Sequence, residues 1–169
     1  ANIKIEDISA IAITQGPGLV GSLHVGIQAA KTLSWLYDIP IIPIHHIIGH
    51  IYANAFVDEL EFPLLALVVS GGHTELVSMK DKWSFEVIGT TGDDAIGEAY
   101  DKVARVLGLG YPGGPVIDKL AKQGKENYTL PTVKVEGKYD FSFSGLKSAV
   151  LQLINRLEKN NAEIIQADI

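Results

Sequence analysis

Cysteine is absent from the 169 residues of this chain. The absence excludes disulfide frameworks, thiolate zinc sites and cysteine nucleophiles, and it suits a reducing compartment such as the cytoplasm. Long hydrophobic runs are absent as well, because the longest apolar stretches, residues 63–69 and 39–44, are far shorter than the ~20 residues of a membrane helix. We therefore expect a cytoplasmic protein that does not span a membrane.

Basic residues are fewer than acidic ones: the chain has 14 lysines and arginines, 20 aspartates and glutamates, and a net charge of −6. The chain as a whole therefore lacks the basic surface that neutralises phosphates, and any nucleic acid would be held largely by other surfaces. Apolar residues make up 47% of the chain, enough for one sizeable core or two small lobes. The chain starts at Ala1 without a methionine and stops at Ile169 without a capping glycine or proline, so we expect a piece of a longer protein.

Strand and helix patterns alternate in the first sixty residues. A short β-rich run over 8–14 is followed by a glycine turn at 15–18 and by apolar residues at helical spacing over 23–33. Residues 41–44 are typical of a buried strand, and a second helical segment covers 46–56. This alternation predicts an α/β protein in which helices cover a sheet.

A different pattern begins in the second third of the chain. Two strands, over 63–70 and 74–79, flank a Gly-Gly pair, which is a two-residue hairpin signal. A third antiparallel strand is expected over 84–91. We therefore predict a first domain over 1–61 and a second over 62–169. The remaining predicted elements are a helix over 93–107 closed by Gly108, a short helix ending at Gln123, paired strands over 132–135 and 139–143, and a helix that Ser144 caps.

Two histidines, His46 and His50, lie four residues apart in a helical segment, so both imidazoles project from one face and can meet a single metal ion. The alternative is a pair of partly buried or surface histidines at a helix start, and the spacing alone leaves both interpretations open. A third histidine, His45, favours the metal. The pair resembles half of a zincin site, but Ile47 stands where H-E-x-x-H requires a general-base glutamate, and no third ligand is evident nearby.

The predicted hairpin over residues 69–74 (VSGGHT) offers backbone N–H groups without Cβ obstruction, beside serine, threonine and histidine side chains. Main chain approaches a phosphate closely through such an arrangement. An ordinary Gly-Gly β-turn is the alternative. Residues 15–22 form another glycine-rich loop before a helix, but they match neither a Walker loop nor a dinucleotide fingerprint.

Carboxylates form a row on the predicted helix over 93–107. One interpretation is a solvated helix face on which Asp101 pairs with Arg105. The other is a set of acceptors for ribose hydroxyls, because a Gly-Gly turn at 113–114 brings bare backbone close and Asp118 adds a carboxylate. Both interpretations stay open. The members of the row are Asp94, Glu98 and Asp101.

Six short motifs follow one another along the chain. They are 15–18 (QGPG), 45–50 (HHIIGH), 69–74 (VSGGHT), 93–102 (DDAIGEAYDK), 110–115 (GYPGGP) and 141–147 (FSFSGLK). Each motif alone is ordinary, but their common order is very specific and covers essentially the whole chain. Together they resemble the bacterial TsaD family, also called Gcp or YgjD.

The resemblance implies a fold, an activity and partners. The fold is an α/β, actin-like ATPase (ASKHA) fold with two ribonuclease-H-like lobes, here incomplete at both ends. The activity is transfer of the threonylcarbamoyl group from threonylcarbamoyl-AMP to N6 of adenosine 37 in tRNAs that read codons starting with A. The partners are TsaB, through a helical dimer interface, the ATPase TsaE and tRNA, with TsaC supplying the adenylate.

The resemblance also implies residue roles. The histidine ligands of the family's iron or zinc fall on His46 and His50, and the third ligand, an aspartate, falls outside this chain. A Lewis acid there would polarise the threonylcarbamoyl group while main-chain donors stabilise charge on the carbonyl and phosphate oxygens. AMP is the leaving group, so no nucleophilic side chain is required. The residues implied to contact the adenylate are Val69, Ser70, Gly71, Gly72, His73, Asp101, Gly114 and Asp118.

Parts of the family pattern are missing from this chain, namely the N-terminal phosphate loop and the C-terminal segment that supplies an asparagine to the nucleotide and an aspartate to the metal. We therefore expect the 169-residue chain alone to be inactive, to bind metal weakly and to be prone to oligomerisation through apolar edges. Two other functions are considered. Ile47 argues against a metallopeptidase, the O-sialoglycoprotein endopeptidase of the family's older label, and the retained His46, His50 and Asp101 argue against a non-catalytic scaffold paralogue.

Overall fold

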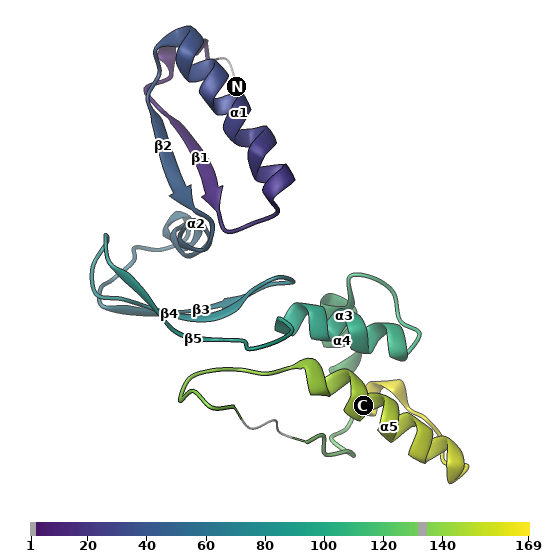
Figure 1. Ribbon diagram of the computed structural model, residues 1–169. Coiled ribbons are helices and arrows are strands. Elements are labelled where there is room, and N and C mark those ends of the chain that lie inside the picture. Colours follow the sequence, from purple (N-terminus) through teal and green to yellow (C-terminus); the bar gives the residue numbers. More distant parts are fainter. Residues whose placement is uncertain (1–2, 132–134) are drawn as a thin grey trace. The chain divides into compact units, whose positions relative to one another are not determined.

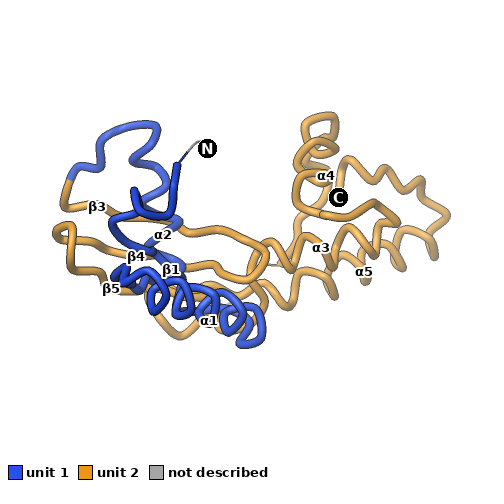
Figure 2. Tube along the Cα trace, turned by 90° about the horizontal axis from the view of Figure 1, so that it is seen from above, with its two compact units in different colours: residues 1–61 blue, residues 62–169 orange. Residues whose placement is uncertain are grey.

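Figure 1 shows the computed structural model of the chain, which describes residues 3–131 and 135–169. The chain divides into two compact units, Ala1–Glu61 and Phe62–Ile169 (Figure 2). Each unit combines strands with helices, so the predicted α/β class is confirmed. Within the described ranges, no helix is both long enough and apolar enough to cross a membrane.

A strand, a crossover helix and a second strand make up most of the first unit. Its elements are a 3₁₀ turn (Ile5–Asp7), β1 (Ile11–Gly16), α1 (Val20–Tyr37), β2 (Ile41–His45), α2 (His46–Tyr52) and a second 3₁₀ turn (Ala53–Phe56). β1 and β2 pair in parallel, and α1 provides the crossover that a parallel pair requires. Figure 1 shows α1 lying along the two strands.

β1 lies later in the chain than the sequence predicts. The apolar run predicts a strand over 8–14, but the N–H of Ile8 donates to the carbonyl of Ile5 at 3.2 Å and closes a 3₁₀ turn. Pairing with β2 starts only at Ile11 and continues into the glycine turn as far as Gly16. The extent of this strand is set by its partner strand and not by the extent of the apolar run.

α1 carries apolar residues on two faces. Ala30 is buried and Ile27 is half-buried, as members of the predicted apolar stripe should be. Val20, Val25 and Trp35 are nevertheless 81%, 73% and 84% exposed. An exposed apolar face of this kind is typical of a surface that binds another protein.

Three antiparallel strands open the second unit, in the order β3-β4-β5. They are β3 (Leu64–Val69), β4 (Thr74–Met79) and β5 (Phe85–Thr90). The three predicted strands are therefore confirmed, and Val69 pairs with Thr74 on the two sides of the glycine turn. Val77 and Met79 of the central strand are buried, whereas Leu65 on the edge strand β3 is exposed.

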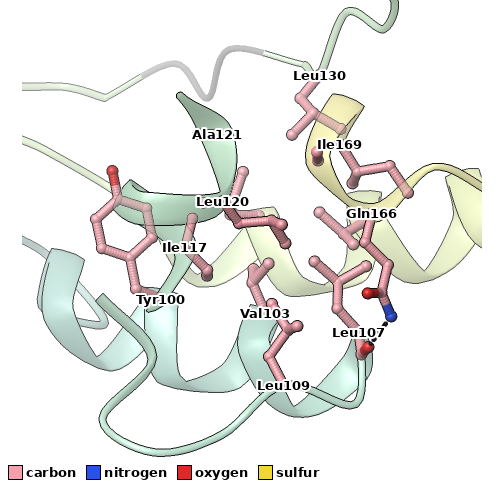
Figure 3. A pocket seen from close by; sticks show the side chains of 13 residues that line it. Tyr100, Val103, Leu107, Leu109, Ile117, Leu120, Ala121, Leu130, Gln166 and Ile169 are labelled. Carbon is pink, nitrogen blue, oxygen red and sulfur yellow. Dashed lines mark hydrogen bonds between the residues drawn. The ribbon is translucent and has the colours of Figure 1, made fainter. Parts of the chain in front are cut away.

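Three helices follow the sheet and share a small core. They are α3 (Ile96–Val106), α4 (Gly113–Ala121) and α5 (Ser144–Lys159). The core is centred on Val103, Leu107 and Val150. An apolar cavity of about 120 Å³ remains between the helices (Figure 3), and Nε2 of Gln166 donates to the carbonyl of Leu107 at its side, at 2.7 Å.

The two ends of α3 differ in how well the sequence predicts them. Gly108, with a φ of +69°, ends the helix as expected, and the N–H of Leu109 donates to the carbonyl of Ala104 at 2.8 Å in a glycine-capped end. The predicted start is wrong, because the sequence predicts a helix from Asp93 whereas α3 begins at Ile96. Asp93 stays outside the helix because its carboxylate binds another part of the unit.

The carboxylate of Asp93 caps α5, fifty residues further along the chain. It accepts the N–H groups of Phe143 at 2.8 Å and Ser144 at 3.2 Å, and the hydroxyls of Ser142 and Ser144. Ser144 is the first residue of α5, and α5 has no side-chain cap of its own. The prediction that Ser144 caps this helix is therefore wrong, because a distant aspartate supplies the cap.

The predicted strand pair before α5 is wrong where the structure describes it. Residues 139–143 form no strand, and Phe141 makes one isolated parallel bridge to Thr91. Asp140 accepts an N–H from the end of β5 at 3.1 Å, so this segment is attached to β5. Residues 132–134 of the expected partner strand lie outside the described residues.

Candidate active site

His46 and His50 face each other at the start of α2. Their Nε2 atoms are 3.2 Å apart, and their rings meet edge to face with centroids 4.5 Å apart. A hydrogen bond joins these two ring nitrogens in the structure. Imidazole nitrogens are common zinc ligands, so the pair supplies two side chains of the type that holds such an ion.

A complete ligand set is not found in the part of the chain that the structure describes, where no group of three or more histidine, aspartate or glutamate side chains is placed to hold a metal ion. Ile47 occupies the position of the zincin glutamate and is 2% exposed, as a member of the core. A general base is therefore missing from that position beside His46.

An open groove of about 320 Å³ lies beside the histidine pair, within the first unit. The end of β1, the turn that follows it and the start of α1 form the groove, and its polar side chains are those of Thr14, Ser22 and His46. A small molecule in this groove would lie next to the imidazole of His46. One predicted ligand histidine thus lines an open groove of the first unit.

The glycine hairpin between β3 and β4 is shaped by the hydroxyl of Ser70. Ser70 Oγ accepts the N–H groups of His73 at 3.0 Å and Gly72 at 3.3 Å. A Cβ built on Gly71 or Gly72 meets nothing within 4 Å, and Val69, which ends β3, is 55% exposed. Two of the donors predicted for a phosphate thus already face an oxygen acceptor, and the side of the turn where side chains would project is open.

Asp101 binds the start of α4. Its Oδ1 accepts the N–H of Gly113 at 2.7 Å, in place of the predicted ion pair with Arg105. Gly113 lies directly on α3, because a Cβ there would come within 2.6 Å of the carbonyl oxygen of Tyr100. Gly114 has more room, with Cδ2 of Tyr100 at 3.7 Å from such a Cβ. The structure therefore brings Asp101 and Gly114 together where α3 meets α4.

The other carboxylates of the predicted site bind lysines. Lys102 Nζ lies 2.6 Å from Asp94 and 3.0 Å from Glu98, and hydrogen bonds to these carboxylates raise the pKa of Lys102. Asp118 pairs with Lys122 at 2.7 Å on the exposed surface of α4. Glu98 is exposed on α3, whereas Asp94 lies before the helix with a side chain that is 18% exposed, and Asp101 contacts Gly113 and not the predicted Arg105.

Sequence reasoning missed two residues that hold the second unit together, Thr74 and Asp93. Thr74 is 2% exposed, and its Oγ1 accepts the N–H of Ile96 at 2.9 Å. Desolvation raises the pKa of the exposed Asp93, but hydrogen bonds from residues 142–144 outweigh it and hold that pKa well below its ordinary value. A hydroxyl residue directly after the hairpin was an available signal for Thr74, whereas no local signal identifies Asp93, whose partners are distant in sequence.

Comparison with known proteins identifies the family. The sequence profile of TsaD, tRNA N6-adenosine threonylcarbamoyltransferase, matches residues 1–169. The chain is 59% identical over 170 residues to proteins named tRNA N6-adenosine threonylcarbamoyltransferase in the Staphylococcus aureus strains Newman, COL and JH9. Each alignment covers 100% of this chain and 50% of the relative, so the chain spans about half the length of these proteins. Because the match runs along the entire chain, the chain belongs to the TsaD family.

Proposed function

We propose that the protein containing this chain transfers the threonylcarbamoyl group from threonylcarbamoyl-AMP to N6 of adenosine 37 in tRNAs that read codons starting with A. The observation that carries the proposal is the facing pair of His46 and His50, with Nε2 atoms 3.2 Å apart, in a chain of the TsaD family. The name borne by the Staphylococcus aureus relatives supports the same activity.

An actin-like fold with two ribonuclease-H-like lobes is part of this proposal. Residues 1–61 would belong to the first lobe and residues 62–169 to the second. The parallel pair of β1 and β2 and the antiparallel sheet of β3, β4 and β5 support the assignment, since lobes of this class combine parallel and antiparallel strands with covering helices.

The proposed reaction requires no nucleophilic side chain. A bond forms between N6 of the adenosine and the carbamoyl carbon, the bond from that carbon to the phosphate oxygen breaks, AMP leaves and N6 loses one proton. The main-chain N–H groups of Gly72 and His73, which donate to Ser70 Oγ in the structure, would turn to the phosphate and carbonyl oxygens and stabilise negative charge there. His46 and His50 would hold an iron or zinc ion, which supplies Lewis-acid polarisation of the carbamoyl group when bound.

The adenylate would also use residues of α3 and α4. Asp101 binds Gly113 through Oδ1, which leaves Oδ2 to accept a ribose hydroxyl. Gly114 would let the ligand approach the backbone closely. Asp118 would offer a further acceptor once its pair with Lys122 opens, which costs little because both side chains are exposed.

The partners in this proposal are TsaB, TsaE and tRNA, with TsaC as the source of the adenylate. The exposed apolar face of α1, with Val20, Val25 and Trp35, suits a helical interface with TsaB. The net charge of −6 suits an assembly in which tRNA is held largely by other basic surfaces. A cytoplasmic location agrees with the absence of cysteine.

Mass spectrometry of the modified nucleoside tests the proposal. Cells depleted of their native enzyme receive the complete gene that encodes this chain, either intact or with His46→Ala and His50→Ala together. We expect the intact gene to restore threonylcarbamoyladenosine in tRNA and the double variant to fail, at equal protein levels.

The matched control is Asn54→Ala, one turn after His50. The Asn54 side chain donates only to backbone carbonyls, at 3.0 Å to that of Ile51 and 3.4 Å to that of His50, so this variant should restore the modification. Equal restoration by the double variant would remove the histidines from catalysis. No restoration by the intact gene would contradict the proposed function.

A further inference from the structure

The glycine hairpin is fastened at both ends to the first turn of α3. The carbonyl of Ser70 accepts the N–H of Gly97 at 3.2 Å, and Oγ1 of Thr74 accepts the N–H of Ile96 at 2.9 Å. Ser70 precedes the two glycines of the turn and Thr74 follows them closely. The position of the turn is therefore set by the position of the helix start.

Thr74 supplies the cap that α3 lacks. Ala95 stands at the cap position, and its methyl group cannot accept an N–H. Thr74 is 2% exposed, and its carbonyl also accepts the N–H of Thr91 at 3.1 Å. A buried donor left without an acceptor is costly, so removal of this hydroxyl would force the N–H of Ile96 to find another partner. Thr74 thus holds β4 and α3 at a fixed separation.

Gly97 allows the close approach of α3 to the hairpin. A Cβ on Gly97 would lie 2.6 Å from the carbonyl oxygen of Ser70, 2.8 Å from Cα of Gly71 and 2.9 Å from its nitrogen. All three atoms belong to the backbone, so a side chain at position 97 must displace either the hairpin or the helix. A Cβ on Gly71 itself meets nothing within 4 Å. Gly97 therefore faces the packed side of the turn, whereas the Cβ position of Gly71 faces the open side.

We propose that Thr74 and Gly97 are positioning residues, which fix the glycine hairpin over residues 70–73 where the phosphate of the adenylate binds. The inference rests on the proposed function, which assigns the hairpin to the adenylate. Neither side chain needs to touch the ligand. A displacement of the hairpin by about 1 Å can cost about a hundredfold in rate.

A merely structural role would lower stability without changing ligand affinity in the folded protein. The test therefore measures KM for threonylcarbamoyl-AMP, kcat, and the inhibition constant of AMP, at a temperature where circular dichroism shows each variant to be folded. The protein comes from the complete gene and is assayed with its partner proteins and tRNA.

Three substitutions form the main series. We expect Gly97→Ala to raise KM and the AMP inhibition constant by about tenfold or more, since a displaced hairpin binds the phosphate less well. Thr74→Val keeps the shape but loses the hydroxyl, and we expect a rise of about three- to tenfold. Thr74→Ser keeps the hydroxyl and should stay within about twofold of the unchanged protein.

Gly92→Ala is the matched control for the added methyl group, because a Cβ on Gly92 meets nothing within 4 Å.

Gly71→Val tests the hairpin directly and should weaken the binding of AMP. If Gly71→Val leaves the AMP inhibition constant unchanged, the hairpin does not bind the adenylate and both assignments are overturned. If Gly71→Val weakens the binding of AMP while Gly97→Ala and Thr74→Val do not, only the positioning role is overturned. Should Gly97→Ala fail to fold, the comparison of Thr74→Val with Thr74→Ser decides in the same way.

Discussion

The two units use their polar side chains in opposite ways. In residues 1–61, His46 and His50 turn their Nε2 atoms toward each other at 3.2 Å. In residues 62–169, Asp93, Asp101 and Thr74 turn their oxygens toward the first N–H groups of α5, α4 and α3. The first unit presents a pair of side chains that one ion can bridge, whereas the second uses its acceptors to join helices.

This difference determines whether the effect of a substitution can be attributed to function or to stability. Removal of the His50 side chain costs little packing because His50 is exposed, whereas His46 is half-buried. Removal of Asp93 or Asp101 leaves backbone N–H groups at a helix start without their acceptor, which changes stability as well as any ligand contact. Function can therefore be tested directly in the first unit, and only against a measured stability in the second.

The largest effect is expected for the histidine pair. His46→Ala together with His50→Ala should lower zinc affinity in the complete protein by more than about a hundredfold, because changes outside the ligand set already cost about 10- to 100-fold. Competition with a colorimetric chelator measures the affinity, and thermal unfolding should show a midpoint close to that of the unchanged protein. Tight metal retained in the double variant would contradict the assignment of these ligands.

The 169-residue chain by itself gives a second test of the first unit. Two histidines are fewer than the three protein ligands of an open metal site, and no larger group is found among the described residues. We therefore expect weak zinc binding to the chain alone in the same competition assay. Stoichiometric, tight binding would mean that a further ligand comes from within this chain.

Gly113→Ala is expected to lower the stability of the second unit. The new Cβ would lie 2.6 Å from the carbonyl oxygen of Tyr100 and 2.8 Å from Cβ of Ala104, and overpacking of this kind costs about 1–3 kcal/mol. Urea unfolding measures the loss. Gly114→Ala is the control, because its Cβ makes only an ordinary contact at 3.7 Å. Equal losses from both variants would show that the contact between α3 and α4 is looser than described.

The elements of this fold follow from local sequence, and their ends follow from distant partners. The three antiparallel strands and Gly108 at the end of α3 were predictable, because alternation, turn residues and a positive φ are local properties. The start of α3 was not, because Asp93 bonds to residues fifty positions away. For the same reason Ser144 was predicted to cap α5, whereas its own N–H is capped by Asp93.

The candidate site also combines features that follow from local sequence with features that depend on distant partners. The facing of His46 and His50 was predictable, since it depends only on a four-residue spacing in a helix. The bond from Gly113 to Asp101 was not, because it requires α4 to fold back onto α3. A sequence row of carboxylates cannot show which member faces a lysine and which faces a helix start.

Asp93→Asn should lower the free energy of unfolding by about 1 kcal/mol, because hydrogen bonds to a charged acceptor contribute more than those to a neutral amide, and the amide nitrogen cannot accept. The pKa of Asp93 lies below its ordinary value of 3.8 when the unit is folded, so its contribution is fully present above that value and is lost as the pH falls through the folded-state pKa. The difference in thermal midpoint between the two proteins should be equal at pH 7 and pH 5 and smaller at pH 3. A difference that shrinks already between pH 7 and pH 5 would contradict this cap.

Asp81→Asn is the matched control for Asp93. Asp81 accepts the N–H groups of Trp83 at 2.7 Å and Ser84 at 3.0 Å within a single turn, and asparagine forms such turns as well. We expect a smaller loss of stability than for Asp93→Asn, as for most surface substitutions. A loss as large as that of Asp93→Asn would mean that joining separate elements adds nothing to the value of a cap.

Asp118→Asn should have the smallest effect on stability, about 0.2–0.5 kcal/mol, because its pair with Lys122 is an exposed pair one helical turn apart. This small cost makes Asp118 the second-unit carboxylate whose ligand role can be tested most cleanly. If Asp118 contacts the adenylate, the inhibition constant of AMP should rise by several fold with an unchanged thermal midpoint, whereas Asp101→Asn should change both quantities because Asp101 also holds Gly113. An unchanged inhibition constant for Asp118→Asn would leave the carboxylate as half of a surface ion pair and would reduce the proposed contacts on α4 to Gly114.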